Sequence, residues 1–199
     1  MQLEELEEPL QLFEINVAIQ QIARSRAPGR DGLPIEYYAT YNEALATKLL
    51  EMYNEAWESG SLPPSLSEAV IVVLHKPGRD PQDVKSYRPL SLLNTDYKIL
   101  SKVLANRLRR IIGDLIHPDH NGFIPTRNTF LNTRRLLHIM QGVPRWGEAL
   151  ATVALDIEKA FDTLGWQYLH AVMAAMQFGP HYVRWIYTLY KNPRARVRL

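Results

Sequence analysis

The sequence predicts an α+β protein that is mostly helical with a few short strands. Apolar residues recur at helical spacing over most of the 199 residues, whereas two short apolar runs, at 69–74 and 149–155, are typical of covered strands. No cysteine occurs, which excludes disulfide scaffolds, thiol nucleophiles and cysteine-based zinc sites. The chain has no internal repeat, and no apolar run approaches the ~18 residues that a membrane span needs.

The first third of the chain predicts two helices that are joined by a turn-rich loop over 24–34. The second helix opens at Pro34, a residue favoured in the first helical turn, and stops at Gly60. The first helix lies within 10–24. Its expected apolar face comprises Leu10, Phe13, Val17, Ile19 and Ile22.

The middle of the chain predicts a strand followed by two basic amphipathic helices. The β-branched run 69–74 predicts a buried strand. A helix over 94–116 has an apolar stripe and an opposite basic face, with Asn94 or Thr95 as its cap. Helix 129–140 is expected to bury Leu131, Leu136, Leu137, Ile139 and Met140.

The last third predicts a strand over 150–156 that is covered on both faces and ends at Asp156. Two helices follow, at about 165–177 and 181–191, separated by a Gly-Pro pair. The basic end, 194–199, alternates like the first strand of a hairpin.

Charge is distributed unevenly along the chain. The formal net charge is +2, but residues 1–60 hold 4 Lys/Arg and 11 Asp/Glu, whereas residues 76–135 hold 12 and 5. The basic stretch would attract a polyanion such as nucleic acid or a nucleoside triphosphate. A solvated surface is the alternative interpretation. The acidic N-terminus does not resemble a signal or transit peptide, so an intracellular protein is expected.

Asp156 is the best single candidate for chemistry, because a carboxylate at the end of a buried strand is fixed in position and can open onto a cleft. Its oxygen ligands suit Mg²⁺. Glu158 and Asp162 are close in sequence, but these acids can equally be helix caps or surface residues. Lys76 and Arg88 bracket the loop after the first strand and could hold phosphate, or could simply be solvated.

Six short sequence blocks lie along the chain at 27–32, 74–80, 87–94, 98–107, 117–127 and 154–162. The last block reads Ala-Leu-Asp-Ile-Glu-Lys-Ala-Phe-Asp. In their order and spacing, the six blocks resemble the reverse transcriptase of a LINE-type non-LTR retrotransposon. The last one resembles the first catalytic motif of the polymerase palm.

This resemblance implies the fingers of a right-hand polymerase at 1–145 and an incomplete palm at 146–199. Asp156 would be the metal-binding aspartate, with the Ile157 carbonyl as a further Mg²⁺ ligand. Phe161 would lie under the incoming sugar, and Lys76 and Arg88 would hold the triphosphate. Three residues of block 117–127 would shape the template and nucleotide pocket: Gly122, Phe123 and Arg127.

The basic faces of the two middle helices are the expected nucleic-acid surface, since contacts to phosphate come mainly from Lys and Arg. The partners implied by the resemblance are an RNA template, a DNA primer and dNTPs, with no membrane, in the cytoplasm and the nucleus. The residues of this surface are Lys98, Lys102, Arg107, Arg109, Arg110, Arg134 and Arg135.

The sequence also departs from the family pattern. It contains no Asp-Asp pair, so the Tyr/Phe-x-Asp-Asp hairpin that supplies the remaining catalytic carboxylates is absent, as are the Gln-Gly-x-Pro motif and the thumb. Thr126 stands where relatives often have glycine. We therefore expect the template- and dNTP-binding half of a polymerase used in target-primed retrotransposition, inactive alone. The alternative is a non-catalytic nucleic-acid-binding remnant of a retroelement.

Overall fold

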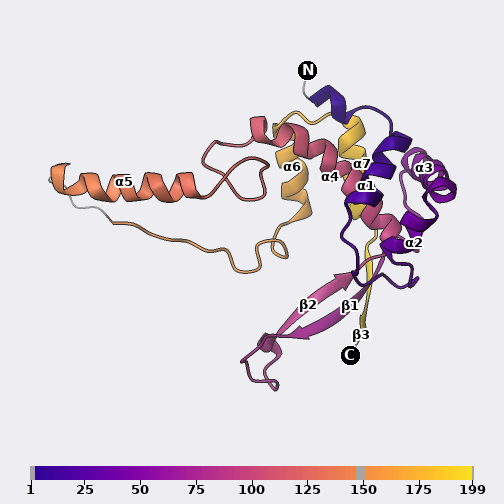
Figure 1. The fold of residues 1–199 in the computed structure, drawn as a ribbon, viewed down its shortest axis with the longest axis horizontal. Helices are drawn as coiled ribbons and strands as arrows, with labels where there is room; N and C mark the ends of the chain where they lie inside the picture. The colour runs from indigo at the N-terminus through magenta and orange to yellow at the C-terminus, as the bar shows by residue number, and fades with distance from the viewer. Residues whose placement is uncertain (1–2, 147–150, 199) are drawn as a thin grey trace. The chain divides into compact units, whose positions relative to one another are not determined.

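The computed structural model of the chain describes residues 3–146 and 151–198. It is largely helical with one three-stranded sheet, which confirms a mixed and mostly helical protein (Figure 1). The helices are η1 (Leu3–Leu6), α1 (Leu12–Gln21), α2 (Ile35–Thr40), α3 (Asn42–Ser59), η2 (Val84–Ser86), α4 (Thr95–Leu115), α5 (Phe130–Trp146), α6 (Trp166–Ala175) and α7 (Pro180–Tyr190). The strands are β1 (Glu68–His75), β2 (Tyr87–Leu92) and β3 (Arg194–Arg198).

The chain divides into two compact units. One comprises Met1–Arg107 together with Gly179–Leu199, and the other comprises Leu108–Phe178. Helix α4 begins in the first unit and ends in the second. The units do not follow the division at residue 145, so the assignment of fingers and palm stays a prediction.

The sheet belongs to the first unit and has the strand order β2-β1-β3. Strands β1 and β2 form an antiparallel hairpin, and β3 pairs with β1 in parallel (Figure 1). The strand predicted at 69–74 is confirmed, and the one predicted at 194–199 is confirmed over its described residues 194–198. The prediction that 69–74 is buried is wrong for most of the strand: Ala69 is buried, but residues 70–72 are half-buried, and Val73 and Leu74 are exposed.

The buried face of α1 differs in part from the predicted one. Leu10 and Ile19 are buried as predicted, but Phe13 and Val17 are exposed. Residues 14, 15 and 18 are buried instead, among them the carboxylate-bearing Glu14. Apolar spacing misplaced part of the face because it counts an acidic residue as outward-facing. Glu14 is buried since it has a cationic partner inside the unit.

That partner is Arg107 of α4, which the helical spacing predicts on the basic outer face. This prediction is wrong: the Arg107 side chain is only 4% exposed. Its Nε and Nη2 atoms donate to the two carboxylate oxygens of Glu14 at 2.7 and 2.6 Å, and the remaining donors reach the backbone carbonyls of Glu8 and Pro9. A bidentate guanidinium with these partners is compatible with burial, whereas an unpaired one is not.

The predicted helix between Pro34 and Gly60 is interrupted at Tyr41, which gives α2 and α3. Gly60 ends α3 with a φ of 64°, a left-handed conformation that glycine adopts at little cost. In the described ranges, none of the helices combines the length and the apolar character that crossing a membrane requires.

Helix α7 completes the first unit against α3 and α4. The Glu7 carboxylate accepts hydrogen bonds from the backbone N–H groups of His181 and Tyr182 at 2.8 and 3.1 Å, and so caps the first turn of α7. The Tyr182 hydroxyl donates to the Leu104 carbonyl of α4 at 3.1 Å. The His181 ring stacks on Trp57 of α3, with ring centres 4.5 Å apart.

The second unit has a thinner core than the sequence predicts. Helix α5 is confirmed, but the side chains expected to be inside it are mostly exposed, including Leu131, Leu136, Leu137 and Met140. The strand predicted at 150–156 is also wrong over the described residues 151–156, which are exposed and have no regular structure. Its residue 150 lies outside the described residues. An apolar run forms a strand only beside another strand that satisfies its backbone, and no described strand pairs with this one.

Replacing Arg107 tests the importance of the buried ion pair. Arg107→Ala leaves the Glu14 carboxylate buried without a partner, so the free energy of unfolding should fall by about 3–5 kcal/mol. Urea denaturation followed by circular dichroism measures this loss. The matched change Arg109→Ala removes an exposed cation two residues later and should alter stability by less than about 0.5 kcal/mol. Equal effects of the two changes would contradict a structural role for Arg107.

Candidate functional site

The β1–β2 hairpin positions Lys76 and Arg88. The register pairs Leu74 with Arg88, and the Lys76 N–H continues the ladder by donating to the Ser86 carbonyl at 2.7 Å. Directly paired residues and residues two positions apart share a face of the hairpin. The register therefore brings Lys76 and Arg88 to one face. Arg88 is exposed, and the Lys76 ammonium group donates to the Lys85 carbonyl at 2.7 Å.

The loop between these two cations is ordered by its own aspartates. The Asp80 carboxylate accepts from the Gln82 N–H and the Asp83 carboxylate accepts from the Lys85 N–H, each at 2.9 Å. Such turns fix the loop without long-range contacts. The resulting hairpin tip presents cations to solvent from a defined backbone.

A second part of the site forms where residues 27–32 meet the start of α4. A Cβ atom on Gly29 would overlap the Asn94 side chain and backbone and would lie 2.5 Å from the Leu93 carbonyl carbon. Only glycine allows this close approach. The Asn94 amide donates to the Ser65 carbonyl at 3.1 Å, and its oxygen accepts from the Asp31 N–H at 3.4 Å.

Two further bonds join this loop to α4. The Thr95 hydroxyl donates to the Leu33 carbonyl at 2.6 Å, and the Lys98 ammonium group donates to the Ala27 carbonyl at 3.1 Å. Asn94 and Thr95 were expected only as caps of α4. The Asn94 side chain instead connects block 87–94 with block 27–32, and its place at the end of a block was the available signal. Thr95 follows that block and binds Leu33, just after block 27–32.

The carboxylate and ammonium groups at this junction have shifted pKa values. Burial raises the pKa of the Asp96 carboxyl above its ordinary value, and the nearby Asp31 charge acts in the same direction. Burial lowers the pKa of Lys98, although the Asp31 charge opposes this shift. Lys98 is thus a half-buried residue of this junction rather than a free surface cation.

The other predicted cations of α4 and α5 lie at or near the surface. Lys102 is half-buried, and Arg109 and Arg110 are exposed. On α5, Arg134 is exposed and Arg135 forms an ion pair with Asp119.

In the second unit, Arg127 is bonded to the chain itself. Its guanidinium donates to the His117 and His120 carbonyls at 2.7 Å and to the Ile116 carbonyl at 3.0 Å, and it also reaches the Gly113 carbonyl. These acceptors include the carbonyls at the end of α4, which lack partners within the helix. Any effect of Arg127 on a ligand therefore passes through the loop that it orders.

Phe123 of the same loop forms an exposed aromatic pair with Phe161, which lies in the segment before α6. The Phe123 and Phe161 side chains are 93% and 83% exposed, and their rings meet edge to face with centres 6.2 Å apart. Thr126 has a φ of 66°, a conformation that glycine adopts easily and a β-branched residue rarely does. This accounts physically for the preference for glycine that the resemblance indicates there. A Cβ atom on Gly122 would meet no atom within 4 Å.

Asp156 and Ile157 lie in the exposed segment that follows residue 150. Carboxylate and carbonyl oxygens are suitable Mg²⁺ ligands. However, in the ranges 3–146 and 151–198, no group of three His, Asp or Glu side chains is placed to hold a metal ion. The described residues therefore do not form a complete metal site.

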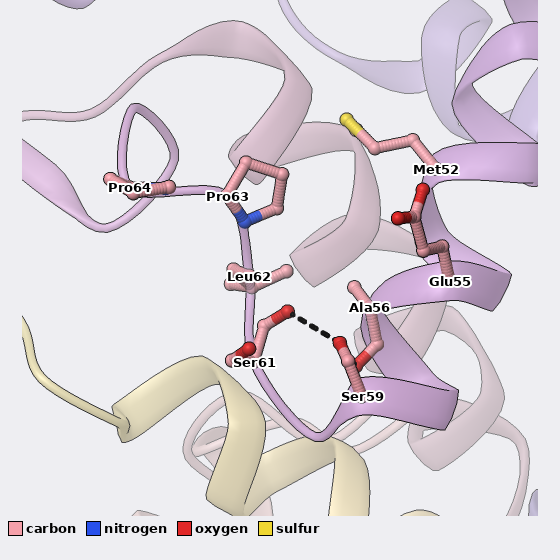
Figure 2. A pocket seen from close by; sticks show the side chains of 8 residues that line it. All are labelled: Met52, Glu55, Ala56, Ser59, Ser61, Leu62, Pro63 and Pro64. Carbon is pink, nitrogen blue, oxygen red and sulfur yellow. Dashed lines mark hydrogen bonds between the residues drawn. The ribbon is translucent and has the colours of Figure 1, made fainter.

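A pocket of about 250 Å³ lies in the first unit, between the end of α3 and the chain that follows it (Figure 2). The Ser59 hydroxyl donates to the Ser61 carbonyl at 3.2 Å at its edge. None of the predicted site residues lines this pocket, and we assign it no function. Its lining is Met52, Glu55, Ala56, Ser59, Ser61, Leu62, Pro63 and Pro64.

Comparison with known proteins identifies the family. Residues 74–198 match the family model "Reverse transcriptase (RNA-dependent DNA polymerase)". The chain is 36% identical over 196 residues to the transposon TX1 uncharacterized 149 kDa protein of Xenopus laevis, which covers 98% of this chain. It is 30% identical over 177 residues, or 87% of the chain, to the probable RNA-directed DNA polymerase from transposon BS of Drosophila melanogaster. It is 30% identical over 153 residues, or 76% of the chain, to the RNA-directed DNA polymerase from mobile element jockey of the same species.

The chain belongs to the reverse transcriptase family, among the polymerases of non-LTR retrotransposons. This confirms the resemblance found in the sequence blocks. The chain spans 15%, 19% and 17% of the lengths of the three relatives named above.

Gly29→Ala tests the close contact between the first sequence block and α4. The added methyl group overlaps Asn94 and the backbone before it, so the substitution should lower the free energy of unfolding by about 1–3 kcal/mol. Thermal and urea denaturation measure the change. Gly165→Ala is the matched control, because its Cβ meets no atom within 4 Å and its φ is −70°. A Gly29→Ala protein as stable as the control would show that the loop does not pack on α4 as described.

Proposed function

We propose that this chain is the template- and dNTP-binding part of an RNA-directed DNA polymerase used in target-primed retrotransposition. Residues 1–145 would act as fingers and residues 146–199 as part of the palm. Membership of the reverse transcriptase family supports the reaction class. The proposed partners are an RNA template, a DNA primer and dNTPs. Such a protein would bind RNA in the cytoplasm and act on DNA in the nucleus.

The single observation that carries this proposal is the hairpin register at Lys76 and Arg88 within the family match. A triphosphate needs several cationic donors from a preorganised backbone. Arg88 supplies a planar guanidinium that can bind phosphate oxygens in pairs, and Lys76 supplies a point charge beside it. The backbone of the intervening loop is held by its own hydrogen bonds, so these groups need little ordering when the triphosphate binds.

The cations of α4 and α5 are proposed to contact the template, each set within its own unit. In the first unit these are Lys102 and, only in part because of its bond to Ala27, Lys98. In the second unit they are Arg109, Arg110, Arg134 and Arg135. Arg107 is left out of the first set since it is buried. Gly122 and Phe123 are proposed to border the pocket on the loop that Arg127 orders, and Phe161 is proposed to lie under the sugar.

Asp156 is proposed as one ligand of a catalytic Mg²⁺, together with the Ile157 carbonyl. Nucleotidyl transfer by two metal ions requires further carboxylates close by. The sequence contains no Asp-Asp pair, and the described residues hold no three-ligand cluster. We therefore propose that other residues of a longer polymerase complete the metal site and that this chain alone does not catalyse.

The second candidate function is a non-catalytic nucleic-acid-binding module. The incomplete metal site favours it, because binding through phosphate contacts needs no metal. The two functions differ in their use of nucleotides: a polymerase part binds dNTPs through Lys76 and Arg88, whereas a module that only binds nucleic acid has no such requirement.

Nucleotide binding by variants of the hairpin tests the proposal. In Lys76→Ala and in Arg88→Ala, loss of a charge-assisted hydrogen bond to phosphate should weaken dTTP binding by about tenfold or more. Equilibrium dialysis with labelled dTTP measures this change. Lys85→Ala is the matched control, because Lys85 lies in the same loop, is exposed and contributes only its carbonyl to the Lys76 bond. Equal dTTP affinity in all four proteins would contradict the proposed triphosphate site.

A further inference from the structure

Three arginines alternate along β3, the edge strand that lies beside β1 (Figure 1). The parallel register pairs Arg194 with Glu68, Arg196 with Val70 and Arg198 with Val72. Because alternate residues of a strand lie on one face, the three arginines form a row on a single face of the sheet. The interposed Ala195 and Val197 lie on the opposite face.

Arg88 of β2 belongs to the same face. The antiparallel register pairs Leu74 with Arg88 and Val72 with Leu90, and Val72 is also the partner of Arg198. The face therefore has arginines on both outer strands. Aliphatic side chains share the face: Leu74 of the central strand β1 is 52% exposed, and Leu90 of β2 is 44% exposed.

The positive charge of this face is only partly neutralised. Glu68 accepts a hydrogen bond from Arg196 at 2.5 Å and another from Arg30, and these bonds lower the pKa of its carboxyl. Within the described part of the chain, Arg194 and Arg198 have no ion-pair partner, and every residue of β3 is exposed. One carboxylate thus pairs with Arg196, one of the four arginines of this face, and with Arg30 of the loop before α2.

The row of arginines is regularly spaced, and so are the charges of a nucleic-acid strand. Alternate residues of a strand lie roughly 6.6 Å apart, which is twice the rise per residue. A nucleic-acid strand carries one phosphate per nucleotide, so several arginines of the row can contact phosphates of the same strand. Guanidinium groups bind phosphate in pairs of hydrogen bonds, which is the geometry that arginine supplies and lysine does not.

We propose that the face formed by Arg194, Arg196, Arg198 and Arg88 is a binding surface for the backbone of a single nucleic-acid strand. The exposed Leu74 and Leu90 side chains favour a single strand, because its unstacked bases can contact apolar groups that a duplex would leave uncovered. Phosphate contacts carry no sequence information, so binding should show little sequence preference. The inference rests on the proposed function for its class of partner and adds a surface outside the predicted site residues of α4 and α5.

The double variant Arg194→Gln/Arg198→Gln tests the surface and leaves the Arg196–Glu68 ion pair in place. Fluorescence anisotropy with a labelled single-stranded RNA of mixed sequence, over a series of salt concentrations, measures affinity and its salt dependence. Loss of two phosphate contacts should reduce the log–log slope by about 1.4 in magnitude, at about 0.7 per contact on a single strand.

The matched control is Arg26→Gln/Lys48→Gln, which removes two exposed cations that do not lie on this face. It should leave the slope unchanged. An equal decrease in the control would show that net charge alone drives binding and would overturn the proposal. A wild-type slope in the double variant would also overturn the proposal. So would a double variant that aggregates with no change in slope, because that result is expected if the arginines only protect an edge strand. Equally tight binding of labelled polyglutamate, lost in the same variant, would point to an acidic protein partner instead.

A second measurement does not depend on the fold of any variant. Phenylglyoxal modifies exposed arginines, and mass spectrometry of the unchanged protein reports the extent of modification at each one. Single-stranded RNA should protect Arg194 and Arg198, whereas dTTP alone should not. Unprotected Arg194 and Arg198 in a protein saturated with RNA would overturn the proposal. Because the dTTP experiment probes Lys76 and Arg88 without RNA, failure of the nucleotide site and failure of this surface are distinguishable.

Discussion

The buried pair of Arg107 and Glu14 is the interaction on which the arrangement of the first unit depends. Through it, the segment before α1 and α1 itself are held against α4, because one guanidinium binds the Glu14 carboxylate and the carbonyls of Glu8 and Pro9. The same N-terminal segment supplies Glu7, which caps α7. Helix α7 leads directly to β3 at the edge of the sheet. The buried Arg107 guanidinium therefore holds the N-terminal segment on α4, and the same segment caps α7, the helix that precedes β3.

Some residues of the family's sequence blocks stabilise the fold, whereas others are proposed to contact substrates. Gly29 and Asn94, from two different blocks, are in direct contact, and Arg127 binds the carbonyls around the end of α4. Such residues position loops without touching a ligand themselves. Lys76, Arg88 and Asp156 are different, since their charged groups lie on the hairpin tip or in an exposed segment. A substitution in the first group should act through stability, and one in the second group through binding.

Local patterns in the sequence predicted the helices well and the partners of charged residues poorly. The apolar stripe of α4 is buried at Ile99, Leu100, Val103 and Leu104, because packing follows the helical period. Arg107 was misplaced because its partner is 93 residues away in sequence, and helical spacing cannot separate a solvated cation from a paired one.

The strand expected before Asp156 does not form for a related reason: composition indicates that a segment can form a strand, but not that a second strand lies beside it. The parallel pairing of β1 with β3 is equally non-local. The sequence did predict that Lys76 and Arg88 bracket the loop after β1, but not the strand β2 that carries Arg88. The role of the two cations stays a prediction.

The central claim is that this chain binds the substrates of a polymerase but does not contain a complete catalytic centre. Primer extension tests it most directly, with a labelled DNA primer annealed to an RNA template, all four dNTPs and Mg²⁺. The chain alone should give no extension above a control without protein, in a sample that binds dTTP through Lys76 and Arg88. Template-directed extension by this chain that is abolished by Asp156→Ala would contradict the claim, because it would show that the carboxylates present suffice for catalysis.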